Sequence, residues 1–138
     1  MKIGVYRVKK KDFFDRNLFG KCPFVTSQVL LSGKWTILIL HELSLGAKKF
    51  NELKREIDIT HSTLSSHLKS LVEEGLVHRE VFPEVPPRVE YSLTEIGKSF
   101  QPVLDSIEIW GNLYIEFLKK RDKKIYGVEV NDAERNVK

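Results

Sequence analysis

The sequence contains a single cysteine, Cys22, and no apolar run that approaches the length needed to cross a bilayer. One cysteine excludes an intramolecular disulfide and any metal site of the CxxC type. A bilayer-spanning helix needs about 20 consecutive apolar residues, so no membrane partner is expected. The N-terminal residues 1–21 also lack the continuous apolar stretch of a secretory signal. The predicted location is therefore the cytoplasm.

Signatures of catalysis and of cofactor binding are missing as well. The chain has no glycine-rich phosphate loop, no grouping of serine, histidine and acidic residues, and no paired carboxylates suited to a pocket. Its four histidines do not form a metal set, because His61 and His67 are not four residues apart and no acidic residue accompanies them at ligand spacing. We therefore expect no catalytic residue, no cofactor and no metal, and the chain is not expected to be an enzyme.

Charge is unevenly distributed along a chain whose net charge is +4. Residues 1–21 hold seven lysines and arginines against two aspartates, whereas residues 34–93 hold eight against nine acidic residues. Total charge therefore argues only weakly for a nucleic-acid partner. The case for such a partner depends on where individual cations lie.

Two helices are predicted after the basic N-terminal arm. Residues 22–33 indicate a short helix with Pro23 at its first position, where a missing N–H costs nothing. Residues 34–46 are apolar on most sides and predict a central, buried helix. His41 falls within this second helix, which makes it an expected core or interface residue.

A helix–turn–helix is predicted next. Residues 48–57 have the spacing of a short amphipathic helix, and residues 60–75 follow after only a few residues around Asp58. Thr60 is a suitable N-cap for the second helix. The apolar stripe of that helix consists of Leu64, Leu68 and Leu71.

Two runs with period-two alternation, residues 77–82 and 88–93, flank the loop "PEVPP" and predict an antiparallel hairpin with a stiff tip. A long helix over residues 94–118 comes last, kinked or restarted at Pro102. The whole order predicts a mainly α-helical fold with a small β-hairpin, a winged helix–turn–helix whose terminal helices form a dimer interface.

In such a fold the second helix of the turn enters the major groove, so its outer face should be short and polar. The residues expected to contact double-stranded DNA are Ser62, Thr63, Ser65, Ser66, His67 and Lys69 on this helix and Arg79 and Arg88 on the hairpin. A plain solvated face is the alternative, but glutamate and lysine are better helix formers for that purpose. Ion pairs with Glu80 or Glu90 compete with phosphate, more strongly for Arg79 than for Arg88.

Apolar residues at alternating spacings of four and three mark the last helix. They are Ile96, Phe100, Val103, Ile107, Trp110, Tyr114 and Phe117. This stripe exceeds what one small domain can cover, so a homodimer is expected, with Phe100, Val103, Ile107, Trp110, Tyr114 and Phe117 at its interface. Ile96 and Phe100 are also expected to fold back in part onto the core near Trp35. From Lys119 the charged chain is expected to fray.

These patterns divide the chain into a basic N-terminal arm, residues 1–21, a DNA-binding and dimerisation domain, residues 22–118, and a charged C-terminal tail, residues 119–138. Apolar residues of the arm could pack against the last helix of the other subunit.

The segments "GKW", "FNEL", "EEGLVHR" and "PEVPPRVEYSLTEIG", found together in this order, resemble the HxlR-type branch of winged helix–turn–helix transcription regulators. The resemblance runs from Cys22 to about Gly111. It implies a cytoplasmic homodimeric DNA-binding regulator, often a repressor, acting on operators with two-fold symmetry. It also implies DNA contacts at Ser62, Thr63, Ser65, Ser66, Lys69 and Arg88. The segment "HSTLSSH" departs from the longer polar residues of many relatives, so an operator sequence does not carry over.

Cys22 lies beside Lys21 at a predicted helix start, where a cation and the helix dipole both stabilise a thiolate. Some members of the resembled family sense oxidants through a cysteine at this position. A packed, inert cysteine is the alternative. A small-molecule or oxidant effector therefore stays open.

A second function from another class is a winged helix used for protein–protein assembly without DNA binding. The slightly negative balance of residues 34–93 gives it some support. An assembly module would more often carry an apolar patch where this chain has a polar, uncharged recognition face.

Overall fold

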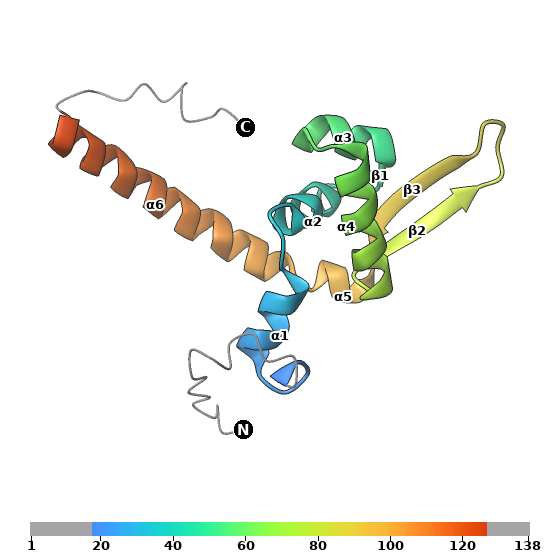
Figure 1. Cartoon of the computed structure of the whole chain (residues 1–138), viewed down its shortest axis with the longest axis horizontal. Helices are drawn as coiled ribbons and strands as arrows, with labels where there is room; N and C mark the ends of the chain where they lie inside the picture. The colour runs from blue at the N-terminus through green and yellow to red at the C-terminus, as the bar shows by residue number, and fades with distance from the viewer. Residues whose placement is uncertain (1–17, 127–138) are drawn as a thin grey trace. The chain divides into compact units, whose positions relative to one another are not determined.

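The computed structural model describes residues 18–126, which fall into two compact units, residues 18–37 and residues 38–126 (Figure 1). Most of the predicted basic arm lies outside the described residues, as does the predicted tail from residue 127 onward. The predicted domain boundaries at residues 22 and 118 therefore stay predictions.

In the first unit, α1 (Pro23–Leu30) begins as the sequence predicts, with Pro23 at its first turn and Cys22 as the N-cap residue. The Thr26 hydroxyl donates to the Cys22 carbonyl at 2.7 Å and accepts from the Gly20 N–H at 2.8 Å. One side chain therefore ties the turn before α1 to the first turn of the helix.

The helix α2 (Thr36–Ser44) runs from the first unit into the second. Its second-unit core residues are Ile39, Leu40 and Leu43. The predicted burial of α2 is confirmed for Thr36, Ile39, Leu40 and Leu43, but Leu38 is 43% exposed and His41 is exposed too. These two residues are three apart and share one face of the helix. His41 is therefore not a core residue.

The helix–turn–helix consists of α3 (Phe50–Ile57) and α4 (His61–Glu73), as predicted. Asp58 ends α3 in the left-handed conformation, with φ of 51°, which aspartate tolerates better than most residues. Thr60 caps α4 by accepting a hydrogen bond from the Thr63 N–H at 3.4 Å. The leucines of α4 pack inward and fix which face of the helix stays outside.

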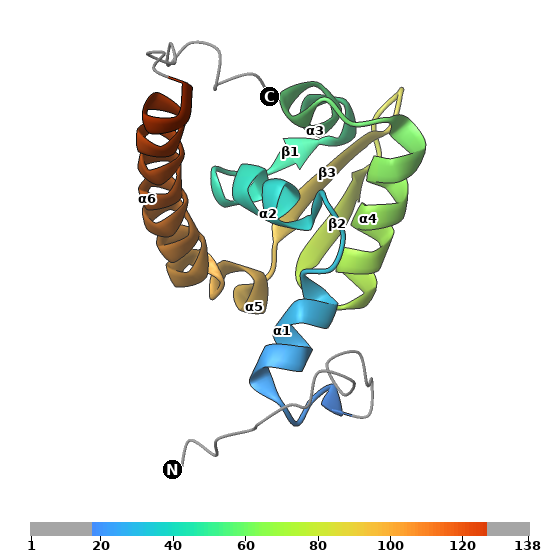
Figure 2. The same cartoon turned by 60° about the vertical axis from the view of Figure 1, so that its left-hand side comes forward.

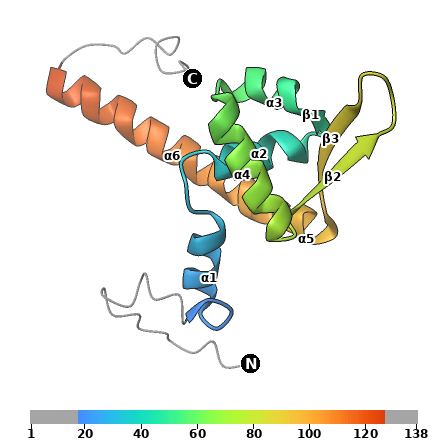
Figure 3. The same cartoon turned by 45° about the vertical axis from the view of Figure 1, so that its right-hand side comes forward.

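The sheet contains β1 (Lys48–Lys49), β2 (Val77–Phe82) and β3 (Arg88–Leu93) in the antiparallel order β1-β3-β2. Sequence analysis missed β1 and placed its two lysines in the following helix, because a two-residue strand is too short to show an alternating pattern. The hairpin of β2, β3 and the loop between them is called the wing. Figure 2 shows α4 lying beside the strands of the wing, and Figures 1 and 3 show the wing extending past that helix.

Cross-strand register places the two wing arginines on opposite faces of the sheet. Arg79 is paired with Tyr91, and Arg88 is paired with Phe82. Directly opposed residues share a face, and residues separated by an odd number of positions on one strand do not. Arg79 and Tyr91 therefore face one way, and Phe82 and Arg88 face the other.

The last helix is interrupted where proline predicts a break: α5 (Glu95–Lys98) ends before α6 (Gln101–Tyr126), and Pro102 is in the first turn of α6. Ile96 is 62% exposed, so the expectation that it folds back onto the core is wrong, whereas Leu104 is buried. The break shifts the helical phase, so a stripe counted continuously from Ile96 does not continue through it.

The expectation that the chain frays from Lys119 is also wrong, since α6 continues to Tyr126. Lysine and arginine are good helix formers, and Lys119 pairs with Glu116 one turn earlier at 3.4 Å. The charged residues from Lys119 to Lys123 are therefore part of α6 and do not end it.

Candidate nucleic-acid interface

The outer face of α4 is polar and exposed. With 100° of rotation per residue, Ser62, Ser66 and Lys69 lie opposite the buried leucine stripe of this helix. All three side chains are exposed, and so is Ser65 toward one flank. The structure therefore brings four of the sequence-predicted contact residues onto one surface. Serine side chains are short enough for a helix backbone to approach a groove floor, and each hydroxyl can donate or accept.

Two other predicted residues of α4, Thr63 and His67, are only half-exposed and lie on its other flank. The Thr63 hydroxyl accepts a hydrogen bond from the Thr60 hydroxyl at 2.8 Å. Thr63 therefore takes part in closing the first turn of α4. Its position is less open to a ligand than that of the neighbouring serines.

A ring contact between His61 and Phe50 joins the first turns of α4 and α3. Their centroids are 4.6 Å apart, with the planes tilted by 50°. Aromatic pairs of this geometry stabilise beyond the area they bury. Sequence analysis did not single out this pair, although both residues flank the predicted turn. The contact links the start of α3 to the start of α4.

A groove of about 420 Å³ separates α4 from the wing. Its walls are formed by Ser65, Leu68, Lys69, Val72 and Glu73 from the helix and Arg79 and Tyr91 from the strands. Arg79 is exposed and, within residues 18–126, forms no ion pair. The groove therefore brings two predicted contact cations, Lys69 and Arg79, to the same side of the molecule.

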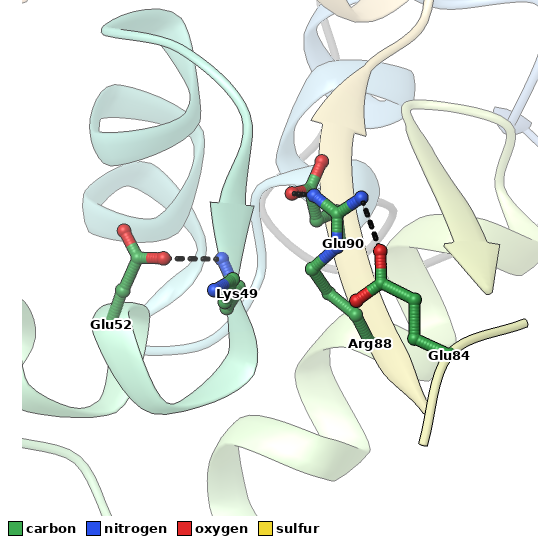
Figure 4. Close-up of polar contacts among 5 residues, drawn as sticks. All are labelled: Lys49, Glu52, Glu84, Arg88 and Glu90. Atoms are coloured by element: carbon green, nitrogen blue, oxygen red, sulfur yellow. Dashed lines mark hydrogen bonds and ion pairs between the residues drawn. The ribbon is translucent and has the colours of Figure 1, made fainter. Parts of the chain in front are cut away.

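Arg88 is placed differently, as Figure 4 shows. Its Nη1 lies 2.6 Å from Glu90 Oε1, and its Nη2 lies 3.1 Å from Glu84 Oε1. Partial desolvation lowers the pKa of Arg88, but the hydrogen bonds and charges of the two glutamates outweigh it and raise that pKa above its ordinary value. Ion pairing was expected more at Arg79 than at Arg88, and the structure shows the reverse.

A second groove, of about 680 Å³, separates the start of α3 from the wing loop. It is lined by residues 49–52, Arg55 and residues 84–89. Glu52 accepts a hydrogen bond from the Lys49 backbone N–H at 3.4 Å and so caps α3 at this place (Figure 4). Lys49 and Arg55 were not predicted as contact residues, because basic residues beside or within a short amphipathic helix are common on any solvated surface.

The predicted dimer residues of α6 are largely uncovered in the single chain. Val103, Ile107, Trp110, Tyr114 and Phe117 are between 36% and 65% exposed, and Phe100 is half-buried. Three of them form a continuous aromatic row, with ring centroids 5.5 Å apart between Trp110 and Tyr114 and 5.4 Å apart between Tyr114 and Phe117. Exposed apolar surface of this extent on one helix usually marks an interface.

Cys22 is fully buried and lies at the N-cap of α1. It is a free thiol. Any reagent or oxidant that reacts with it must first reach a side chain that has no exposed surface in the described structure.

Comparison with known proteins matches residues 30–119 to the HxlR-like helix-turn-helix family. The helix-turn-helix-type transcriptional regulator YdeP of Bacillus subtilis (strain 168) is 39% identical over 114 residues, which cover 78% of this chain and 89% of YdeP.

Among solved structures, a MarR-family transcriptional regulator from Porphyromonas gingivalis W83 is 41% identical, with a TM-score of 0.63 over 66% of this chain and 90% of that one. The redox regulator HypR in its reduced form is 36% identical, with a TM-score of 0.67 over 72% of this chain and 99% of that one. The described fold is thus that of winged-helix regulators, and these relatives give no support to an assembly module without DNA binding.

Proposed function

The chain belongs to the HxlR-like helix-turn-helix family, and we propose that this DNA-binding transcription regulator reads duplex sequence with Ser62, Ser65 and Ser66 of α4. The supporting observation is that these serines are exposed on the face of α4 opposite its buried leucines. A major groove about 12 Å wide admits a helix with short side chains, which can then reach base edges. A serine hydroxyl can donate a hydrogen bond to either base of a pair or accept one from it, so it can contact several different base sequences.

Lys69 and Arg79 are proposed as the cations that hold the backbone of the duplex. They line the two walls of the groove between α4 and the wing. Phosphate contacts fix the register and orientation of a protein on DNA, whereas base contacts carry sequence information. This division of work explains how a chain of modest net charge can bind DNA, because its cations lie beside the reading face.

A homodimer is proposed to form through the exposed apolar face of α6. The residues proposed for its interface are Phe100, Val103, Ile107, Trp110, Tyr114 and Phe117. A two-fold axis would place two copies of α4 about 34 Å apart, in successive major grooves on one side of the duplex. The operator is then expected to have two-fold symmetry. We propose that the protein acts in the cytoplasm as a repressor. A dimer bound across a promoter would repress by excluding the polymerase.

An oxidant effector acting through Cys22 is a second proposal, supported by the similarity of this chain to HypR, a redox regulator. The buried position of Cys22 opposes it, since a fully covered thiol behaves as a small apolar residue. Iodoacetamide labelling across pH separates the two. Labelling that begins well below the ordinary thiol range supports a sensor, whereas labelling only near that range, and slowly, ends the sensor proposal.

The DNA proposal is tested by fluorescence anisotropy with a labelled duplex from the upstream region of the protein's own gene. Arg79→Met and Lys69→Met should each weaken binding and lower the slope of log affinity against log salt by about one per subunit. Asp105→Asn, on an exposed turn of α6, serves as a control that should leave the salt slope unchanged. Equal slopes in all four proteins would contradict the assignment of these two cations.

A further inference from the structure

Arg88 is held on three sides by side chains of its own hairpin. Glu90 and Glu84 each accept a hydrogen bond from the guanidinium, at 2.6 and 3.1 Å. The guanidinium carbon also lies 3.9 Å from the centroid of the Phe82 ring, which is cation–π distance. Arg88 is therefore a partly covered cation with two carboxylate partners and one aromatic partner, whereas Arg79 is exposed.

These partners come from three different parts of the wing. Phe82 ends β2, Glu84 belongs to the loop and Glu90 lies in β3. At the start of the loop, the Glu84 N–H also donates a backbone hydrogen bond of 2.8 Å to the Phe82 carbonyl. One planar guanidinium thus connects the tip of the wing to both of its strands. An ammonium can donate to two carboxylates, but it lacks the rigid planar fork that reaches both while it stacks on the Phe82 ring, so a lysine should hold these three partners less well.

Two glutamates lie opposite each other on this face of the wing, and a nearby cation reduces the repulsion between them. Glu80 is directly opposite Glu90 in the register. Like charges directly opposite each other destabilise a hairpin, and Arg88 neutralises one member of the pair. A phosphate that took Arg88 would leave Glu84 and Glu90 without their counter-ion beside another anion. Within residues 77–93, the face that carries Arg88 therefore has no second arginine or lysine to offer a DNA backbone, and the nearby Lys49 and Arg55 belong to β1 and α3.

Resting on the proposed function, we propose that Arg88 is a positioning residue that clamps the wing, and that Arg79 on the opposite face is the phosphate ligand of the wing. The clamp holds the loop in one conformation before DNA binds. The wing that carries Arg79 then loses little conformational entropy on binding. The sequence predicted instead that Arg88 itself contacts DNA, at the phosphate backbone or in the minor groove.

The test compares conservative and non-conservative variants at the two arginines: Arg79→Met, Arg79→Lys, Arg88→Met and Arg88→Lys. Binding of the labelled duplex from the upstream region of the gene is measured over a range of salt concentrations. In parallel, hydrogen exchange of the Glu84 backbone amide is measured in the DNA-free protein. Circular dichroism confirms that each variant is folded.

A positioning role at Arg88 predicts that lysine fails to rescue it. Arg88→Met and Arg88→Lys should both bind several-fold more weakly with an unchanged salt slope, and their Glu84 amide should exchange faster. Arg79→Met should lower the slope by about one per subunit, whereas Arg79→Lys should bind almost as tightly as the wild type. Neither Arg79 variant should change the Glu84 exchange.

The proposal is overturned if Arg88→Met lowers the salt slope and Arg88→Lys restores it, because that pattern belongs to a phosphate contact. It is also overturned if Glu84 exchange is unchanged in both Arg88 variants. A wild-type protein that binds no duplex would contradict the proposed function instead, and the exchange data would then show whether the clamp exists without it.

Discussion

Gly97 in α5 lies directly against the Leu76 carbonyl oxygen, so closely that an added Cβ at position 97 would overlap with that oxygen. The residue is buried, and the atom in the way is backbone, which cannot swing aside as a flexible side chain can. Leu76, just before the wing, and α5, just after it, are therefore in contact at a position that only glycine can occupy.

Gly97→Ala is expected to destabilise the protein by about 1–3 kcal/mol, the usual cost of forcing an extra methyl into a packed site. Urea denaturation followed by circular dichroism measures the change. Gly111→Ala is a matched control, since an added Cβ there meets nothing within 4 Å and α6 should gain from alanine. A Gly97→Ala protein as stable as the wild type would show that this junction is loose.

Thr94 joins the end of α4 to the start of α5 through one hydroxyl. It donates to the Gly75 carbonyl at 2.6 Å and accepts from the Gly97 N–H at 3.1 Å. Thr94→Ala should therefore lower the free energy of unfolding by about 1–2 kcal/mol, because it removes a helix cap and a second hydrogen bond together. Thr94→Ser keeps the hydroxyl and should stay close to the wild type. Equal losses in both variants would mean that the methyl group matters and the hydroxyl does not.

Sequence periodicity predicted the helix–turn–helix and the hairpin because their apolar patterns are dictated by local geometry. Leu64, Leu68 and Leu71 recur at helical spacing and are buried as expected. The strand β1 could not be predicted, since its two residues are defined only by their pairing with Tyr91 and Glu90, far away in the sequence.

The exposure of individual side chains was harder to predict than the elements that carry them. Three carboxylates and two arginines share the wing, and which of them pair depends on the cross-strand register and on the loop conformation. Counting residues could not show that Glu84 turns back to reach Arg88. The exposure of Ile96 was missed for a related reason. The position of the break between α5 and α6 decides which side of α5 faces the same way as the apolar stripe of α6, and the sequence does not show that position.

Substitutions on the reading face should change specificity more than general affinity. Ser62→Ala and Ser66→Ala each remove one hydroxyl from the exposed face of α4 and leave its leucine stripe intact. Loss of a base contact costs about 1–3 kcal/mol on the preferred sequence and little on random DNA. The comparison is made by competition between an operator duplex and a scrambled one. Ser70→Ala, on the flank of α4, is the control; equal effects at all three serines would argue against base readout by this face.

A charge on the apolar face of α6 should separate the subunits. Trp110 is 65% exposed in the single chain and is part of the aromatic row with Tyr114. Trp110→Glu would bury a carboxylate in the proposed interface, and loss of such an aromatic contact costs about 2 kcal/mol or more. Light scattering coupled to size-exclusion chromatography should give a monomer for this variant and a dimer for Asn112→Glu, which lies on the opposite side of α6. A Trp110→Glu protein that stays dimeric would place the interface elsewhere.

Two copies of α4 are proposed to read the two halves of a symmetric site, and the decisive experiment is selection of bound fragments from the organism's genomic DNA. The wild-type protein should enrich sites with two-fold symmetry whose half-sites are about 10 base pairs apart. Ser62→Ala with Ser66→Ala should change the bases preferred within each half-site. Fragments without shared sequence or symmetry, or an unchanged preference in the double variant, would contradict this proposal.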